Sequence, residues 1–211
     1  MLVGADKIVA TTDLIKNNKW FTHIYPRISS IPNGVNGKKL VKLNPEIVIA
    51  ADKNNKEELL KNGFTVLYPS FTNHADMKKS ISIMAEVIGD DAPKIAQKFN
   101  EYFDGNLKRV LSKTDKIAAS DRPKVLHIAD GKNLLKADGT NTIIDEWIRV
   151  AGGQNAVSKA GNMLELNAEE IININPDVII IGRAKAPEIL KNYMKIKSMP
   201  AQTLSKTKKS M

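Results

Sequence analysis

A short segment between residues 20 and 27 combines aromatic rings with cationic side chains. His23, Tyr25 and Arg27 alternate along it, just after Trp20 and Phe21. Aromatic rings pack against flat apolar rims, and an arginine guanidinium pairs with carboxylates through two parallel hydrogen bonds. We therefore expect this segment to contact a flat or chelated anionic ligand. The alternative is that Trp20 and Phe21 are core residues and Arg27 is solvated.

Two further candidates follow apolar runs that read as β-strands. Asp130 comes after the run 124–128, and Arg183 comes after the run 178–181. Ligands of open α/β sheets bind beyond the carboxyl ends of the parallel strands, so both side chains are predicted to contact the ligand. A rival interpretation is an enzyme that uses Asp130 or Asp138 as an acid or base. Carboxylates beside glycines are more often turn formers, which favours the binding interpretation.

Several classes of active site find no support in the sequence. There is no cysteine, no Gly-x-Ser-x-Gly motif and no phosphate-binding glycine loop. His127 lies within an apolar strand and is predicted to be a satisfied core residue, whereas His23 and His74 are predicted to be exposed loop residues. No histidine pair has the spacing of a helical zinc site, so neither a metal site nor a cofactor is predicted. A site that joins His23, His74 and an acid is the remaining alternative.

The positive charge is concentrated at one end of the chain. The 211 residues carry a net charge of +9, and residues 191–211 alone contribute +6, with six lysines and no acid. We interpret residues 191–211 as a basic tail, since a lysine-rich run with few aromatic rings is typical of a solvated segment and not of a nucleic-acid-binding arm. Hydrophobic residues make up 42% and charged residues 26%, as in ordinary globular proteins. The sequence shows no membrane-spanning stretch and no signal peptide.

One helix–Asn-Pro–strand pattern occurs twice. Residues 38–50 contain it around Pro45, and residues 169–181 repeat it around Pro176. Proline ends a helix, and the β-branched run that follows favours a strand buried on both faces. Two distant copies of this pattern predict two similar α/β lobes with a cleft between them.

A long helix is predicted between the two copies. From Ala92 onward, apolar residues recur with helical spacing to Leu111. A helix of about 24 residues would extend roughly 36 Å, so it should connect the lobes. We therefore predict an α/β fold of two Rossmann-like lobes with central parallel sheets, joined by a single long α-helix. The expected divisions are an N-terminal lobe at 1–90, the connecting helix at 91–117 and a C-terminal lobe at 118–211.

Local signals predict the smaller elements. We expect strands at 7–11, 64–68 and 124–128, and a loop at 21–32. A helix at 56–61 should stop at Asn62-Gly63, and a hairpin or a ligand-binding loop is expected around 133–136. Another helix, capped by Thr140 or Asn141, should end at Gly152-Gly153, and a last helix should run from 187 to Tyr193.

Seven segments fall in the order found in one known family. They are residues 6–12, 44–50, 63–67, 122–126, 139–141, 151–156 and 175–180. Over roughly residues 4–190 the chain resembles the periplasmic substrate-binding proteins of ABC importers for iron–siderophore, haem or cobalamin; some members take nickel chelates. The resemblance implies a monomer, periplasmic or associated with the cell envelope, that binds a metal chelate between its lobes and delivers it to the permease. It implies no enzymatic activity and no cofactor besides the bound ligand.

The resemblance also implies where the permease would dock and where this chain departs from the family. An acidic residue on each lobe is expected to contact the permease, and Glu169 matches one such position. Lys38 stands at the equivalent position of the first copy, so the docking is not expected to be symmetric. The chain also lacks the family's first strand and its closing strand and helix. It is therefore expected to be truncated at both ends, with unpaired sheet edges and an incomplete second lobe.

Overall fold

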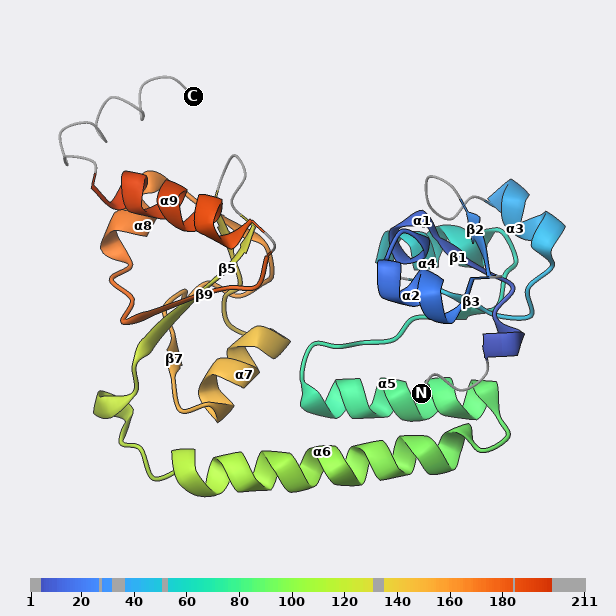
Figure 1. The fold of residues 1–211 in the computed structure, drawn as a ribbon, viewed down its shortest axis with the longest axis horizontal. Helices are drawn as coiled ribbons and strands as arrows, with labels where there is room; N and C mark the ends of the chain where they lie inside the picture. The colour runs from blue at the N-terminus through green and yellow to red at the C-terminus, as the bar shows by residue number, and fades with distance from the viewer. Residues whose placement is uncertain are drawn as a thin grey trace. The chain divides into compact units, whose positions relative to one another are not determined.

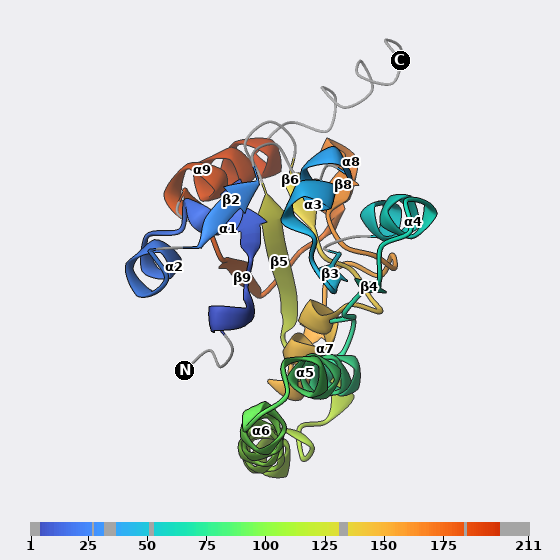
Figure 2. The ribbon, with the colours of Figure 1, turned by 90° about the vertical axis from the view of Figure 1, so that its right-hand side faces the viewer.

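The computed structural model describes residues 5–26, 28–31, 37–50, 53–130, 135–183 and 185–198. The chain forms two compact units, which are described separately below (Figures 1 and 2). The first unit comprises Met1–Phe71 and Ala75–Glu101, and the second comprises Thr72–His74 and Tyr102–Met211. Helix α6 (Ala92–Thr114) continues without a break from one unit into the other.

The first unit contains two small parallel sheets. Strand β1 (Ala10–Thr12) pairs with β2 (Ser29–Ile31), and β3 (Val48–Ile49) pairs with β4 (Val66–Leu67). Leu40, Val48, Ala50 and Leu59 form a core between the second sheet and its helices. The helical elements ahead of β4 are η1 (Ala5–Lys7), α1 (Asp13–Lys16), α2 (Lys19–Ile24), α3 (Gly37–Leu43) and α4 (Lys53–Lys61). The first helix–Asn-Pro–strand copy is thus confirmed as α3 followed by β3, but Ile49 is 55% exposed, so the prediction that this strand is buried on both faces was wrong.

Two local predictions for this unit were wrong. The strand expected at 7–11 is displaced, because Ala5–Lys7 forms a 3₁₀ turn and only Ala10–Thr12 is extended. The loop expected at 21–32 instead contains most of α2 and all of β2. Helix α2 forms because the side chain of Asn18 accepts hydrogen bonds from the backbone N–H groups of Trp20 and Phe21.

Helices α5 (His74–Ile88) and α6 form a hairpin whose contact is lined with small residues. Ala85 of α5 packs against Ala92 and Ala96 of α6, which lets the two backbones approach closely. Gly89 and Asp90 turn the chain with φ values of 74° and 51°. The long helix predicted from the apolar stripe is confirmed, and Gly105 does not interrupt it.

The second unit is built on a mixed five-stranded sheet. Strand β5 (Lys124–Asp130) pairs in parallel with β9 (Val178–Ile181) and β7 (Gln154–Asn155), and antiparallel with β6 (Leu135–Ala137). Strand β8 (Leu164–Leu166) pairs antiparallel with β6. The helical elements are η2 (Ala119–Asp121), α7 (Ile143–Val150), α8 (Ala168–Asn173) and α9 (Ala186–Lys197). The α/β fold is confirmed, but this sheet is mixed and not purely parallel. The antiparallel pairing of β5 with β6 favours the hairpin over the ligand-binding loop, while residues 131–134 lie outside the described residues.

The core of the second unit lies between the sheet and helices α8 and α9. Ile171, Ile189 and Tyr193 pack there with Leu126 and Ile128 of β5. Strand β9 follows α8, so the second copy of the repeated pattern is also confirmed. Its two faces differ, however. Ile179 and Ile181 pack against the core, whereas Val178 and Ile180 are 42% and 46% exposed, so the prediction that both faces are buried was wrong.

Two helix boundaries also differ from the predictions. Helix α7 is capped by Thr142, whose hydroxyl accepts a hydrogen bond from the N–H of Asp145 at 3.1 Å, and not by Thr140 or Asn141. Helix α9 continues past Tyr193 to Lys197, whose ammonium group donates to the carbonyl oxygens of Ile172 at 2.7 Å and Ile174 at 3.2 Å. The first part of the predicted basic tail is therefore folded helix, while residues 199–211 lie outside the described residues.

Among the described residues, no helix is both long enough and apolar enough to cross a membrane.

Candidate functional site

Helix α2 presents most of its side chains to solvent. None of its residues is buried, and Trp20 and Ile24, one turn apart, are 77% and 60% exposed. These side chains are therefore available for contact with another molecule. The aromatic residue singled out in the sequence is therefore on the surface and not in the core.

A shallow hollow of about 520 Å³, wide open to solvent, lies next to this helix. Asn17, Lys19, Thr22 and His23 line it. Lys19 and His23 are four residues apart on α2, so an ammonium group and an imidazole face the same hollow. These groups suit an anionic ligand, and an imidazole nitrogen can also coordinate a transition metal. The predicted segment 20–27 contains Thr22 but stops short of Lys19, which helical spacing would have indicated had the segment not been read as a loop.

Tyr25 lies at the end of α2, where its ring is 5.2 Å from that of Phe21. His23 is exposed in the last turn of the same helix. His23 therefore lies on a helix and Tyr25 at its end, not in a loop, and residues two positions apart on a helix do not face each other. Arg27, the third predicted residue of this segment, lies outside the described residues.

In the second unit, Asp130 and Arg183 lie at the same edge of the sheet. Ile128 of β5 is opposite Ile181 of β9, so both strands end at this edge. The Nε of Arg183 donates a hydrogen bond to the carbonyl oxygen of Ala129 at 2.6 Å, and the residue is exposed. The carboxyl ends of the parallel strands therefore carry the two side chains that the sequence predicted there.

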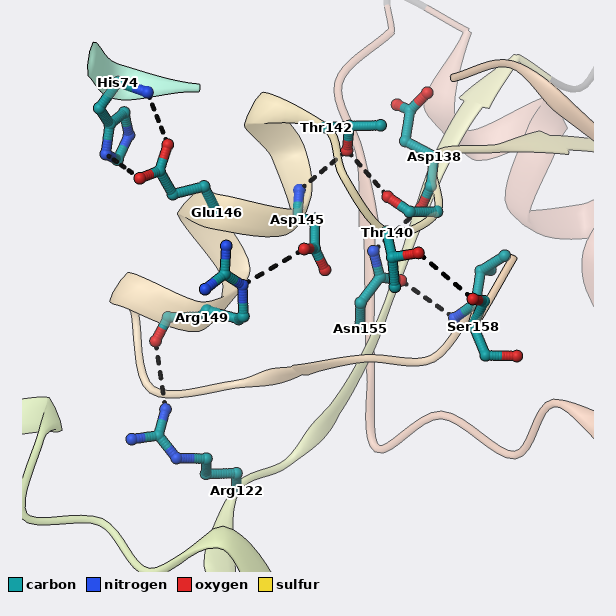
Figure 3. Close-up of polar contacts among 12 residues, drawn as sticks. His74, Arg122, Asp138, Thr140, Thr142, Asp145, Glu146, Arg149, Asn155 and Ser158 are labelled. Atoms are coloured by element: carbon teal, nitrogen blue, oxygen red, sulfur yellow. Dashed lines mark hydrogen bonds and ion pairs between the residues drawn. The ribbon is translucent and has the colours of Figure 1, made fainter. Parts of the chain in front are cut away.

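The prediction for His74 was wrong, because this residue is buried and not an exposed loop residue. It begins α5, and Glu146 of α7 accepts a hydrogen bond from its backbone N–H at 2.6 Å (Figure 3). The second oxygen of Glu146 lies 3.4 Å from Nδ1 of the ring, whose edge faces Phe103. The carboxylate supplies an acceptor and a negative charge at a helix N-terminus. The ring of His74 is thus buried against Glu146 and Phe103, which argues against a ligand site shared with His23.

His127 is a satisfied core histidine, as predicted. Its Nδ1 lies 2.8 Å from Oδ2 of Asp138, and Oδ1 of Asp138 accepts a hydrogen bond from the N–H of Met163 at 2.9 Å. The backbone oxygen of Asp138 also accepts from the side chain of Asn155 (Figure 3). Both carboxylate oxygens of this buried aspartate are occupied, which disfavours Asp138 as an acid or base.

Glu169 is exposed in the first turn of α8. Its neighbour Glu170 forms a capping box with Asn167 and an ion pair with Lys159. The hydrogen bond from Lys159, together with that from the Asn167 backbone, lowers the pKa of Glu170 below its ordinary value. In the first unit, Lys38 occupies the equivalent helix start and is also exposed. The two repeat helices therefore present opposite charges, as the sequence indicated.

Within the described parts of the chain, no three His, Cys, Asp or Glu side chains converge as the ligands of a metal ion would.

Comparison with known proteins identifies relatives along almost the whole chain. YvrC of Bacillus subtilis, an uncharacterised ABC transporter substrate-binding lipoprotein, is 24% identical over 194 residues, which is 87% of this chain and 60% of YvrC. The high-affinity heme uptake system protein IsdE of Staphylococcus aureus is 24% identical over 127 residues, which is 59% of this chain and 42% of IsdE. The chain thus spans less than two thirds of the length of either relative.

Solved structures share the fold. The structure of S. aureus IsdE complexed with heme aligns with a TM-score of 0.70 and 20% identity, covering 95% of this chain and 80% of that one. The periplasmic vitamin B12 binding protein BtuF of Vibrio cholerae aligns with a TM-score of 0.71 and 15% identity, covering 92% and 77%. The model of the periplasmic binding protein family matches residues 2–207. Because this match includes both units and the helix that connects them, the chain belongs to the periplasmic binding protein family.

Proposed function

We propose that this chain is the substrate-binding component of a bacterial ABC importer. It would capture a metal chelate in the cleft that the sequence predicts between its lobes and deliver the chelate to the permease unchanged. Membership of the periplasmic binding protein family and the similarity to the substrate-binding lipoprotein YvrC support this role. A periplasmic or envelope-associated location and a monomeric state fit the same role.

The observation that carries the ligand proposal is the surface of α2. Lys19 and His23 face one hollow, and the 77% exposed Trp20 is on the same short helix. This combination suits a flat or chelated ligand that carries negative charge, with the indole against its apolar part and the imidazole within reach of its metal. An iron–siderophore or haem is the proposed ligand. Nickel chelates and cobalamin are the alternatives, and the vitamin B12 binding protein BtuF has the same fold.

The second unit would contribute a cation to the same ligand. The Nε–H of Arg183 is held by the carbonyl oxygen of Ala129, so the guanidinium is oriented while the residue stays exposed. A guanidinium fixed in this way can donate two parallel hydrogen bonds from its remaining N–H groups to a carboxylate. Asp130 at the same edge would accept from a donor on the chelate. Glu169, exposed on α8, would contact the permease.

A fluorescence titration tests the proposal. In the Trp147→Phe variant Trp20 is the only tryptophan, so its quenching reports on ligands that approach α2. The protein is titrated with haem, a ferric siderophore, cobalamin and nickel–histidine. We expect saturable quenching by one of them with a Kd in the micromolar range, and recovery of that ligand chemically unchanged. Turnover of the ligand, or quenching that never saturates with any of the four, would contradict the proposal.

Matched variants locate the binding surface. Arg183→Ala and Lys19→Ala should each raise the Kd about tenfold, since each removes a charge-assisted hydrogen bond. Arg109→Ala on α6 and Lys53→Ala on α4 remove exposed cations elsewhere and should leave the Kd unchanged. Equal effects in the test and control variants would show that only net charge matters.

A further inference from the structure

We propose that the outer face of helix α9 is a docking surface for an anionic lipid bilayer. This α9 outer face consists of Leu190, Lys191, Met194 and Lys195, all of which are exposed. The proposal concerns a different surface from the ligand-binding residues and does not depend on the identity of the ligand.

The packing of α9 determines which side chains it turns outward. Ile189 and Tyr193 are only 4% and 3% exposed, so they fix the rotation of the helix about its axis. Leu190 and Met194, each one position further along, are consequently directed away from the core and are 42% and 57% exposed. Being four residues apart, they form a short apolar stripe along the helix.

A basic stripe runs beside the apolar one. Lys191 and Lys195 are also one turn apart, and no described residue forms an ion pair with either. Glu188, the only acid of α9, lies at the start of the helix, 3.8 Å from Lys185. The sequence from 191 to 211 contains six lysines and no acid, so the charge of this end of the chain is strongly positive.

A hydrogen-bonded contact with α8 fixes the orientation of α9. The ammonium group of Lys197 binds the last carbonyl groups of α8, so this lysine anchors the helix and does not belong to its outer face. The apolar and basic stripes therefore lie on a helix that is packed against the second unit.

Adjacent apolar and basic stripes match the chemistry of a bilayer surface. Leucine and methionine side chains can enter the boundary between headgroups and acyl chains, while lysines contact the phosphates of anionic lipids. A purely acidic protein surface would use the lysines but would gain little from Leu190 and Met194. An anionic lipid surface uses both stripes at once, and it is the occupant that we propose.

Vesicle co-sedimentation tests this proposal with the full chain. We expect binding to vesicles of mixed phosphatidylglycerol and phosphatidylcholine, little binding to pure phosphatidylcholine, and loss of binding at high salt because the lysine–phosphate attraction is screened. Replacing both lysines, Lys191→Gln with Lys195→Gln, should lower the partition coefficient about 25-fold, or about fivefold for each lysine. The pair Leu190→Ser and Met194→Ser should lower it about tenfold.

A control pair separates this face from net charge. Lys108→Gln with Lys113→Gln removes two exposed lysines of α6 and should change the partition coefficient less than about twofold, because distant charges are screened. Unchanged circular dichroism and Tm show that each variant is folded. The proposal is overturned by equal losses in the α6 and α9 lysine pairs, or by equal binding to pure phosphatidylcholine. It is also overturned if light scattering detects a dimer that Leu190→Ser with Met194→Ser dissociates, since a second copy then occupies this face.

Discussion

The imidazole of His127 and the carboxylate of Asp138 form a largely buried pair in the second unit. Nδ1 of the ring lies 2.8 Å from Oδ2, and only 17% of the histidine side chain and 7% of the aspartate side chain are exposed. The other oxygen of Asp138, Oδ1, accepts a hydrogen bond from the backbone N–H of Met163, a residue with a positive φ of 54°. One carboxylate therefore connects strand β5 to the loop that leads into β8.

Removing this carboxylate should destabilise the second unit strongly. In Asp138→Ala, both His127 and the Met163 N–H lose their acceptor in a site that water reaches poorly. We expect the free energy of unfolding to fall by about 3 kcal/mol. Asp115→Ala, at an exposed position just after α6, should change it by less than about 0.5 kcal/mol. Urea denaturation followed by circular dichroism measures both, and equal losses would show that the Asp138 contacts do not stabilise the fold.

Gly139 and Gly105 should respond to alanine in opposite ways. A Cβ at Gly139 would lie 1.8 Å from the carbonyl oxygen of Lys159, whereas one at Gly105 would meet no atom within 4 Å. Gly139→Ala must therefore displace backbone and should cost at least about 2 kcal/mol of stability. Gly105→Ala should instead stabilise α6 by up to about 1 kcal/mol, because alanine is the better helix former.

Thermal unfolding of the two alanine variants, measured side by side, tests this contrast. A Tm of Gly139→Ala at or above that of the unmodified chain would show that the loop adjusts without strain.

Glu170 should make the free energy of unfolding depend on pH in the acidic range. Its pKa is lowered by the hydrogen bond from Lys159 and by that from the Asn167 backbone, so the folded state binds this proton less readily than the unfolded state. The resulting stabilisation is present above the ordinary pKa of 4.5 and is lost as the pH falls through the lower folded value. Glu170→Gln should remove this component and flatten the stability profile below pH 4.5.

The control for Glu170 is Glu188→Gln on α9, which removes a carboxylate 3.8 Å from Lys185 with 67% of its side chain exposed. It shows how far the loss of one exposed carboxylate by itself changes the profile. If the Glu170→Gln and unmodified profiles were parallel, Glu170 would not contribute to the acid dependence.

Tyr193 should make the stability of the protein depend on pH in the alkaline range. Burial raises the pKa of its phenol above the ordinary value of 10.0, because ionising it in the core is unfavourable. The folded state thus holds this proton more tightly, so the stability is complete below pH 10.0 and is lost as the pH rises toward the folded pKa. Tyr193→Phe should remove this alkaline loss.

Tyr102 supplies the matched comparison, since it is 72% exposed whereas Tyr193 is 3% exposed. In a tyrosinate absorbance titration, Tyr193→Phe should remove the most alkaline component, and Tyr102→Phe should leave that component in place. The interpretation fails if Tyr193→Phe removes a component that titrates near the ordinary pKa.

Local signals predicted the larger elements well. Pro45 and Pro176 each separate a helix from a strand, because a proline cannot continue a helix. The apolar stripe that begins at Ala92 became a 23-residue helix, and Gly63, with a φ of 80°, ends α4 as expected. These features depend on interactions between near neighbours in the chain, which a sequence displays directly.

The candidate site was predicted only in part. His23 and Tyr25 were selected for their chemistry, and Asp130 and Arg183 for their place after strands. Asp130 and Arg183 do follow neighbouring strands at one edge of the sheet, whereas of the first two only His23 is among the described residues that line the hollow. Helix α2 was missed because its start depends on the Asn18 cap, and with it the contribution of Lys19 to the hollow. A single capping side chain in a polar segment is a weak sequence signal.

The sequence by itself thus determined the repeated helix–strand pattern, the connecting helix and the opposite charges of Lys38 and Glu169. Only the tertiary structure decided which histidines are buried and which faces of β9 and α9 meet solvent. His74 illustrates the reason, since its partner Glu146 is 72 residues away along the chain. Burial and pairing arise from contacts between distant segments, and those contacts exist only once the chain has folded.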